Sequence, residues 1–175
     1  MAATETVNLY FGSMLVAPGT GVVLNNQMDD FAVSTGVANA FGLRQSELNL
    51  VGPGRRPLSS MAPTMLLDRG EAVLAAGGSG GPRIITGVLW SILNTVDGGM
   101  APDAAVAAPR LHHQWSPDTV RTDAAVTPEV RAELEARGHR LVPAEGEAAV
   151  QLGVRDAQNL SAASDPRKGG RPAGR

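Results

Sequence analysis

The clearest pattern of apolar positions in this chain lies between residues 84 and 96. Apolar side chains recur there at helical spacing: Ile84, Ile85, Val88, Leu89, Ile92, Leu93 and Val96. A continuous stripe of this kind predicts an amphipathic α-helix that packs one face against a core.

Two shorter helices are predicted after this one. The segment from Pro102 to Ala108 has proline in its first turn, and Pro109 ends it. The segment after Thr127 begins with a proline, and Gly138 follows its last turn. A threonine N-cap, an early proline and a terminal glycine are the usual boundaries of a helix, so we expect a helix between Thr127 and Gly138.

Strands are predicted before the first helix. Residues 65–67 and 72–75 are apolar and flank a short polar turn that contains Gly70, which predicts a hairpin with a positive φ at that glycine. Residues 4–31 alternate between apolar and turn-forming residues and favour short strands, whereas residues 34–57 are typical of a loop. Strands, a hairpin and helices in this order are compatible with a sandwich of mixed α and β layers, an α+β fold, and periodicity alone predicts no more than this.

The bulk properties exclude several classes of function. The chain has 175 residues, a formal net charge of −2 and no cysteine. This charge gives no reason to expect a nucleic-acid or membrane partner, and the lack of cysteine excludes disulfides and thiolate metal sites. We expect one domain over residues 1–165 and a disordered basic tail over residues 166–175.

Three polar segments are candidates for chemistry. The amides and carboxylates of residues 25–31 directly follow the apolar residues 21–24, then come Ser59 and Ser60, and then the glycine-rich residues 77–83. Acceptors, hydroxyl donors and bare backbone amides in this order suit a small zwitterion with a reacting carbonyl group. The glycine-rich segment lacks the Gly-Lys-Ser/Thr ending of a phosphate-binding loop, and no cofactor is expected.

These segments resemble the small subunit of γ-glutamyltranspeptidases, also called glutathione hydrolases. The resemblance runs in order through most of the chain, along residues 4–13, 18–21, 25–31, 57–61, 77–83, 109–115 and 163–167. It implies the N-terminal-nucleophile hydrolase fold, an αββα sandwich of which this chain supplies only part. The implied partners are γ-glutamyl compounds such as glutathione and the large subunit of the same precursor, and bacterial relatives are typically periplasmic or secreted.

The resemblance also implies a nucleophile that this chain lacks. In the family, a precursor cuts itself, and the new N-terminal threonine of the small subunit attacks the substrate. That threonine is expected about fifteen residues before the position of Thr6, which lies upstream of Met1. We therefore expect a small-subunit portion truncated at its N-terminus and inactive alone.

By resemblance, eight residues have functional roles. Thr6 polarises the nucleophile, and the N–H groups of Gly80 and Gly81 form the oxyanion hole. The substrate amine is held by Asn8, Gln27 and Asp30, and its α-carboxylate by Ser59 and Ser60. Taken without the resemblance, Ser59 and Ser60 are typical of a capped turn, and Gln27 and Asp30 of a solvated loop. Thr6 is then an ordinary β-branched strand residue, and the glycines mark a tight turn packed close to a neighbour.

Other interpretations remain open. One is a degenerate, non-catalytic module that keeps a γ-glutamyl pocket, and another is an acylase or capsule-anchoring transpeptidase of the same fold. The pair Ser59 and Ser60 together with Asp30 favours an α-amino acid head group over simple acylase substrates. The neighbouring His112 and His113 are expected to point to opposite faces and to be structural rather than metal ligands.

We also expect the isolated chain to associate with itself. A strand near residues 7–11 would be an unprotected edge if the strand beside it comes from elsewhere.

Overall fold

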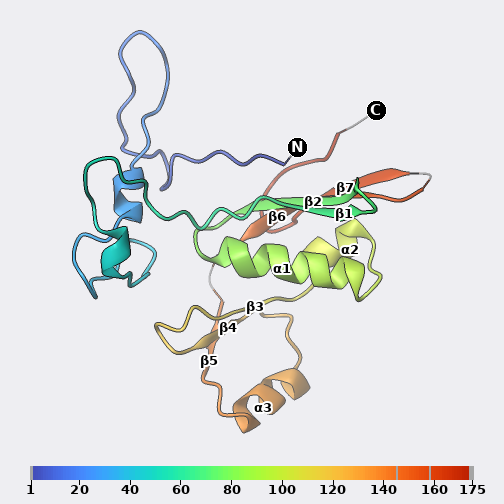
Figure 1. The fold of residues 1–175 in the computed structure, drawn as a ribbon. Helices are drawn as coiled ribbons and strands as arrows, with labels where there is room; N and C mark the ends of the chain where they lie inside the picture. Colours follow the sequence, from blue (N-terminus) through green and yellow to red (C-terminus); the bar gives the residue numbers. More distant parts are fainter. Residues whose placement is uncertain (1, 145, 158, 174–175) are drawn as a thin grey trace. The chain divides into compact units, whose positions relative to one another are not determined.

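Figure 1 presents the computed structural model, which describes residues 2–144, 146–157 and 159–173. The chain divides into two compact units. Residues Glu5–Ser59 form the first, called here the N-terminal unit. Residues Met1–Thr4 and Ser60–Arg175 form the second, called here the main unit.

The main unit is built on a four-stranded antiparallel sheet. Its strands are β1 (Thr64–Asp68), β2 (Glu71–Ser79), β6 (Ala149–Arg155) and β7 (Leu160–Ser164), in the order β1-β2-β6-β7. The predicted hairpin is confirmed as β1 and β2, and its turn residues Arg69 and Gly70 have φ angles of 50° and 86°. Positive φ at both turn positions is typical of the tightest hairpins, because it matches the twist of the two strands.

Two helices cover one face of this sheet (Figure 1). They are α1 (Arg83–Val96) and α2 (Pro102–Ala107), and both confirm the sequence prediction. The core lies between the helices and the sheet and contains the following buried residues: Leu74, Ala76, Ile84, Val88, Ala105, Val106, Ala148, Val150, Leu152 and Ala163. Small and branched aliphatic side chains dominate it, as the scarcity of aromatic residues requires.

The sheet covers only part of the apolar stripe of α1. Ile84 and Val88 are buried, while Ile85, Leu89 and Val96 on the same stripe are exposed. The periodicity predicted the helix correctly, but only part of its apolar surface faces the core of the main unit.

A second, smaller sheet completes the main unit. It consists of β3 (Leu111–His112), β4 (Val120–Thr122) and β5 (Leu141–Pro143), with β3 antiparallel and β5 parallel to β4. Helix α3 (Pro128–Ala136) connects β4 to β5. Its predicted N-cap is confirmed, because the side chain of Thr127 accepts a hydrogen bond from Val130 N.

The N-terminal unit differs from the prediction of short strands over residues 4–31. These residues form turns, one isolated antiparallel bridge between Val16 and Val23, and the short 3₁₀ helix η1 (Gln27–Asp30). The physical reason is that Asn8, Phe11 and Met14 have positive φ angles, which interrupt extended backbone. The expected edge strand over residues 7–11 is therefore wrong.

The segment after this region is mostly loop, as predicted. It contains only the 3₁₀ helix η2 (Glu47–Asn49) and two isolated bridges, Ala32 with Leu50 and Ala38 with Arg44. Side-chain amides replace sheet hydrogen bonds here: Asn39 and Asn49 both bond to nearby main-chain groups.

The beginning of the predicted tail is held in place. Arg167 contacts Asp123 and Asp165, and Lys168 Nζ donates to Ser79 Oγ at 3.0 Å. The sequence did not indicate these contacts of Arg167 and Lys168, and the expected disorder from residue 166 stays a prediction. Part of that expectation falls on residues 174 and 175, which lie outside the described residues. The division into a domain over residues 1–165 and a tail stays a prediction.

Within the described ranges, no helix combines the length and the apolar character that a membrane-spanning helix needs.

Candidate functional site

In the N-terminal unit, one asparagine ties the first turns to the segment before η1. Asn26 Oδ1 accepts from Leu9 N at 3.0 Å, and Asn8 Nδ2 donates to Asn26 O at 3.2 Å. Thr6 Oγ1 accepts from Asn8 N at 2.8 Å. The predicted site residues Thr6 and Asn8 are thus adjacent to each other and joined to the predicted site segment through Asn26. Asn26 lies within the candidate segment 25–31, but no role had been predicted for it.

The predicted amine-binding residues Gln27 and Asp30 share the single turn of η1. Desolvation, the nearby charge of Asp29 and a partly opposing side-chain hydrogen bond from Gln27 together leave the pKa of Asp30 above its usual value. A carboxylate that is partly buried beside a like charge gains most from a cationic ligand. This environment suits a site for a substrate ammonium group.

Two side-chain amides from the following loop hold the main chain of this turn. Asp30 O accepts hydrogen bonds from Gln45 Nε2 at 3.1 Å and from Asn49 Nδ2 at 2.7 Å. The carboxylate of Asp29 accepts a hydrogen bond from Ala40 N at 3.3 Å. The loop over residues 34–57 therefore acts as the support of η1, which the sequence did not indicate.

The predicted carboxylate-binding pair is divided between the units. Ser59 is the last residue of the N-terminal unit, and Ser60 begins the return of the chain to the main unit. Ser59 is exposed and Ser60 is half-buried. Their assignment to the substrate carboxylate stays a prediction.

In the main unit, Gly80 and Gly81 connect the end of β2 to the start of α1. Their φ angles are 141° and 61°, values that a residue with a side chain rarely adopts. Gly81 O accepts from Ile84 N at 3.1 Å. Within the described ranges, the N–H groups of these two glycines have no hydrogen-bond acceptor in the protein. Two unpaired N–H groups at the positive end of a helix suit an anion or a developing oxyanion.

Gly80 is also packed closely against a neighbour, as expected for a glycine that marks a tight turn. A Cβ atom added to Gly80 would lie 2.6 Å from the Cα of Ala148, and one added to Gly78 would lie 2.8 Å from the carbonyl oxygen of Ala149. The first residues of the predicted glycine loop in fact belong to β2, where Gly78 pairs with Val150. Close packing and unpaired N–H groups therefore occur together at Gly80.

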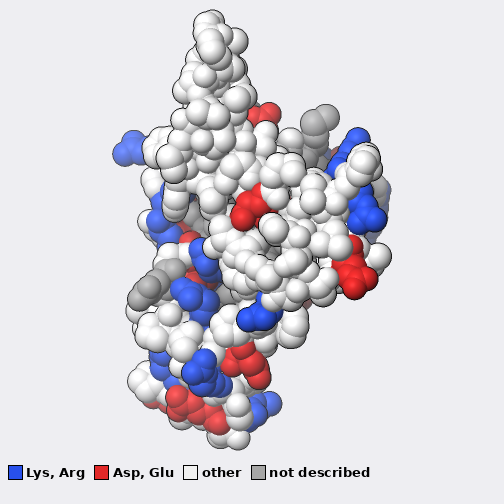
Figure 2. Space-filling model, turned by 90° about the vertical axis from the view of Figure 1, so that its left-hand side faces the viewer, with Lys and Arg blue, Asp and Glu red and all other residues white. Residues whose placement is uncertain are grey.

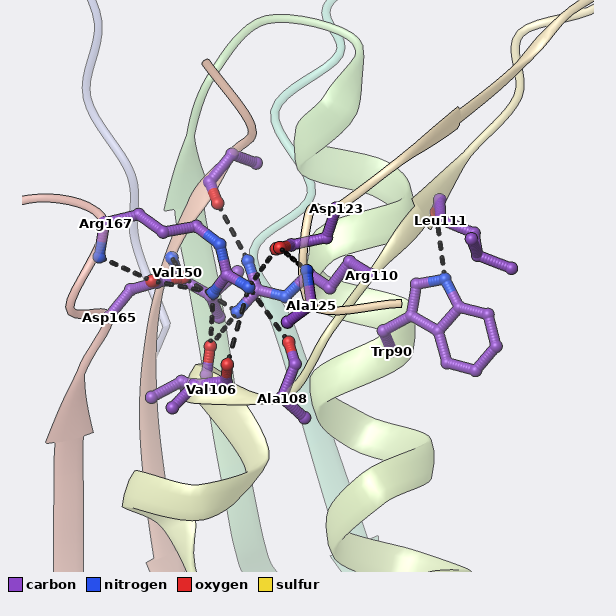
Figure 3. A network of polar contacts seen from close by, with 12 residues as sticks. Trp90, Val106, Ala108, Arg110, Leu111, Asp123, Ala125, Val150, Asp165 and Arg167 are labelled. Carbon is purple, nitrogen blue, oxygen red and sulfur yellow. Dashed lines mark hydrogen bonds and ion pairs between the residues drawn. The ribbon is translucent and has the colours of Figure 1, made fainter. Parts of the chain in front are cut away.

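The main unit also contains a buried cluster of charged residues that the sequence did not indicate (Figure 3). Arg110 Nη2 and Asp165 Oδ2 are 2.7 Å apart, and the two side chains are 2% and 0% exposed. Arg167 bridges from Asp165, at 3.1 Å, to Asp123, at 2.6 Å. The four residues come from three separate parts of the chain, so only the fold brings them together.

Backbone groups complete this cluster. Asp165 accepts from Val150 N and Arg167 N, both at 3.0 Å, and Arg110 donates to the carbonyl oxygens of Val106 and Ala148. Burial by itself raises the pKa of Asp165, but these two N–H groups and the charge of Arg110 outweigh it and hold the pKa below its usual value. The signal in the sequence was the arginine of segment 109–115 and the aspartate and arginine of segment 163–167, to which the resemblance gave no role.

The two neighbouring histidines differ in burial and in their hydrogen-bond partners. His112 is buried, and its ring nitrogens bond to Thr86 Oγ1 and Gln114 Oε1. His113 is more exposed and pairs with Asp118 at 2.9 Å. Within the ranges that the structure describes, no group of three or more His, Asp or Glu side chains could hold a metal ion.

On the face of the molecule shown in Figure 2, no large area carries charge of one sign. Figure 2 shows basic and acidic side chains interspersed on one face, with wide uncharged areas between them. Long-range attraction of a nucleic acid would need a larger area of positive charge.

Comparisons with known proteins agree on one family. The family model described as "Gamma-glutamyltranspeptidase" matches residues 1–175. The chain is 42% identical to the glutathione hydrolase proenzyme of Pseudomonas sp. (strain A14), over 100% of this chain and 29% of that protein. It is 44% identical to the glutathione hydrolase proenzyme of Escherichia coli (strain K12), over 95% of this chain and 29% of that protein. The chain thus spans less than a third of the length of these relatives.

A solved structure shows the same fold. The crystal structure of a mutant γ-glutamyltranspeptidase from Helicobacter pylori matches with a TM-score of 0.90 and 36% identity, over 95% of this chain and 92% of that chain. The expectation of a partial N-terminal-nucleophile hydrolase fold is confirmed. Of the αββα sandwich, the main unit supplies a four-stranded sheet and the helix layer on one of its faces.

Proposed function

Because this chain belongs to the γ-glutamyltranspeptidase family, we propose that it is the part of a γ-glutamyltransferase or glutathione hydrolase that binds and polarises γ-glutamyl amides. In this reaction, the oxygen of a nucleophilic hydroxyl group attacks the γ-carbonyl carbon. The C–N bond then breaks, the amine leaves with a proton, and water or an acceptor amine releases the glutamyl group. Glutathione is the proposed substrate.

The observation that carries this proposal is the arrangement on η1. Asp30 and Gln27 lie on one turn, and Asn26 directly precedes it. Asn8 Nδ2 donates to the main-chain oxygen of Asn26, and the next residue, Leu9, donates its N–H to the Asn26 side chain. A carboxylate and two amides can accept the three N–H bonds of an ammonium group. The raised pKa of Asp30, which burial and Asp29 cause, means that a bound cation stabilises the charged form of this carboxylate.

The remaining groups of the glutamyl head have proposed partners as well. Ser59 and Ser60 would donate their hydroxyl protons to the α-carboxylate. Thr6 Oγ1 accepts from Asn8 N, which leaves its hydroxyl proton to donate to the nucleophile. None of these residues is itself proposed as the nucleophile.

The N–H groups of Gly80 and Gly81 would stabilise the oxyanion. The carbonyl oxygen gains negative charge as the nucleophile attacks, and two preorganised N–H donors favour that charge more than they favour the neutral amide. The positive end of α1 adds to the effect.

The test uses a precursor chimera, in which residues 1–175 replace the matching 29% of the Escherichia coli relative. The preceding sequence of that relative is retained, and with it the threonine that the resemblance implies as nucleophile. We expect the chimera to cleave a chromogenic γ-glutamyl anilide and glutathione. A folded and processed chimera without activity on either would support the non-catalytic interpretation instead.

Two variants of the chimera test the assignments. Asp30→Asn keeps the shape of the side chain but removes the charge, and should raise KM for γ-glutamyl substrates. Asp118→Asn removes a carboxylate whose contact is with His113 on the surface of the main unit, and should leave KM unchanged. Equal effects of the two substitutions would argue against an amine site at Asp30.

A further inference from the structure

The buried Arg110 and the candidate oxyanion loop meet at one residue, Ala148. Arg110 Nη1 donates to Ala148 O at 2.8 Å, and Ala148 is 1% exposed. Gly80 lies directly against this residue, since an added Cβ would come within 2.6 Å of its Cα. The backbone at position 148 thus has the arginine bound to its carbonyl group and the glycine packed on its Cα.

Arg110 itself is held rigidly. Its guanidinium pairs with the carboxylate of Asp165, which is fixed by Val150 N and Arg167 N. Val150 is only two residues from Ala148, on β6. The arginine therefore binds the start of β6 twice, once through the Ala148 carbonyl group and once through Asp165.

The N-terminal half of α1 also packs against Ala148. A Cβ atom added to Gly87 would lie 3.1 Å from Ala148 Cβ and 3.6 Å from Arg110 Nη1. Gly80 and Gly81 lie between β2, which pairs with β6, and α1, which packs on Ala148. The positions of both ends of the glycine loop thus depend on Ala148.

We propose that Arg110 is a positioning residue that sets the direction of the Gly80 and Gly81 N–H groups through Ala148. This proposal rests on the oxyanion role given to these glycines under Proposed function. In this proposal, Arg110 contacts no atom of the substrate. An N–H donor is effective only within a few tenths of an ångström of the oxyanion position, so a shift of Ala148 would lower the rate without weakening the binding of the substrate.

The first variant for the test is Arg110→Lys in the precursor chimera. Lysine keeps one positive charge for Asp165 but cannot bind the carboxylate and the Ala148 carbonyl group with a planar fork. We expect kcat to fall roughly 10- to 100-fold, less than the 100- to 1,000-fold of deleting an oxyanion donor. Arg131→Lys is the matched control, because Arg131 also donates to main-chain carbonyls, those of Val126 and Asp123, but does not contact Ala148.

The second variant, Gly87→Ala, keeps every charge. Alanine favours the helix more than glycine does, so the helix itself is stabilised. Its methyl group would press on Ala148 Cβ at 3.1 Å and shift either α1 or the start of β6. A fall in kcat here would come from geometry alone, and this variant decides the question if Arg110→Lys does not fold.

The decisive readout is the affinity for two ligands. A γ-boronic acid analogue of glutamate forms a tetrahedral anion with the nucleophile, while glutamate itself binds only through its amine and carboxylate. A positioning role predicts that the analogue loses affinity in parallel with kcat, and that glutamate binds as before.

Two results would overturn the proposal. One is an unchanged affinity for the boronic acid in folded Arg110→Lys and Gly87→Ala. The other is a parallel loss for glutamate and the boronic acid, which would mean a general structural role. Inactivity of the unmodified chimera would count against the proposed function, so the two failures can be told apart.

Discussion

Arg110 and Asp165 form an ion pair with a separation of 2.7 Å that is closed off from solvent, although 54 residues lie between them in the sequence. Each belongs to a segment that resembles the family, but neither residue was assigned a role from the sequence. The fold brings them together. Several predictions about stability and catalysis depend on this pair and on the turn of η1.

Removal of one partner of the buried pair should be strongly destabilising. Asp165→Asn leaves the guanidinium of Arg110 buried without its counter-charge, and we expect a loss of about 3–5 kcal/mol in the free energy of unfolding. The double variant Arg110→Met with Asp165→Leu should lose less, because no unpaired charge remains. Denaturant unfolding of the precursor chimera measures both, and a double variant as unstable as the sum of the single ones would contradict this.

The stability should also depend on pH in a defined direction. Burial acts to raise the pKa values of Asp165 and Asp123, but hydrogen bonds and the neighbouring arginines outweigh it and leave both below the usual value. A carboxylate with a lowered pKa in the folded state stabilises the protein above its unfolded pKa. That contribution should disappear as the pH falls through the folded pKa. Thermal unfolding of the chimera between neutral and acidic pH tests this.

Asp165→Asn provides the comparison for that experiment. With the group removed, the acid loss of stability should be smaller than in the parent chimera. A variant with the same pH dependence as the parent would show that the loss comes from other carboxylates.

The turn of η1 predicts a second pH effect, on substrate binding. The raised pKa of Asp30 means that kcat/KM should fall on acidification at a higher pH than an ordinary aspartate would give. Asp29→Asn removes the like charge that contributes to this shift and should move the acid limb to lower pH. An acid limb that stays in place in Asp29→Asn would show that another group controls it.

Gly80→Ala should impair catalysis by two effects. The new methyl group meets Ala148 Cα at 2.6 Å, and the φ angle of 141° is unfavourable for alanine. We expect kcat to fall by about 100-fold or more, comparable to the loss of an oxyanion donor. Gly99→Ala is the control, because Gly99 has a φ of 62° but would place its Cβ in open space. A similar loss of activity in both variants would point to backbone strain rather than to the oxyanion loop.

Residues 165–168 and residues 169–175 should differ sharply in their contribution to stability. Deletion of residues 169–175 leaves all contacts of Asp165 and Arg167 in place and should change the free energy of unfolding by less than about 0.5 kcal/mol. Deletion from residue 165 removes the counter-charge of Arg110 and should prevent stable folding. Circular dichroism and thermal unfolding of both truncated chimeras check this, and equal stability would contradict the role of the network.

The expected self-association of the isolated chain now has a different basis. The edge strand over residues 7–11 does not exist, but Tyr10, Phe11 and Met14 in the same region are 92%, 76% and 81% exposed. Exposed apolar side chains in this number favour association. Light scattering of residues 1–175 tests it, and a monodisperse monomer would be the contrary result.

The sequence by itself determined the local elements whose signals lie within a few residues. The stripe from Ile84 to Val96, the cap at Thr127 and the turn at Gly70 each predicted an element that the structure contains. Such elements follow from side-chain spacing and from the backbone angles that glycine, proline and capping residues permit. The resemblance added the family and the fold, because the motifs occur in order along the whole chain.

Tertiary structure decided what distant residues do to one another. The irregular path of residues 4–31 depends on the side chain of Asn26 and on the close approach of Gly12 to Leu24, which apolar alternation does not encode. The contact of Ala148 with Arg110 and Gly80 exists only once β2, β6 and α1 are assembled. Hydrogen bonds and close packing between such segments are set by three-dimensional distance, and sequence spacing carries no record of that distance.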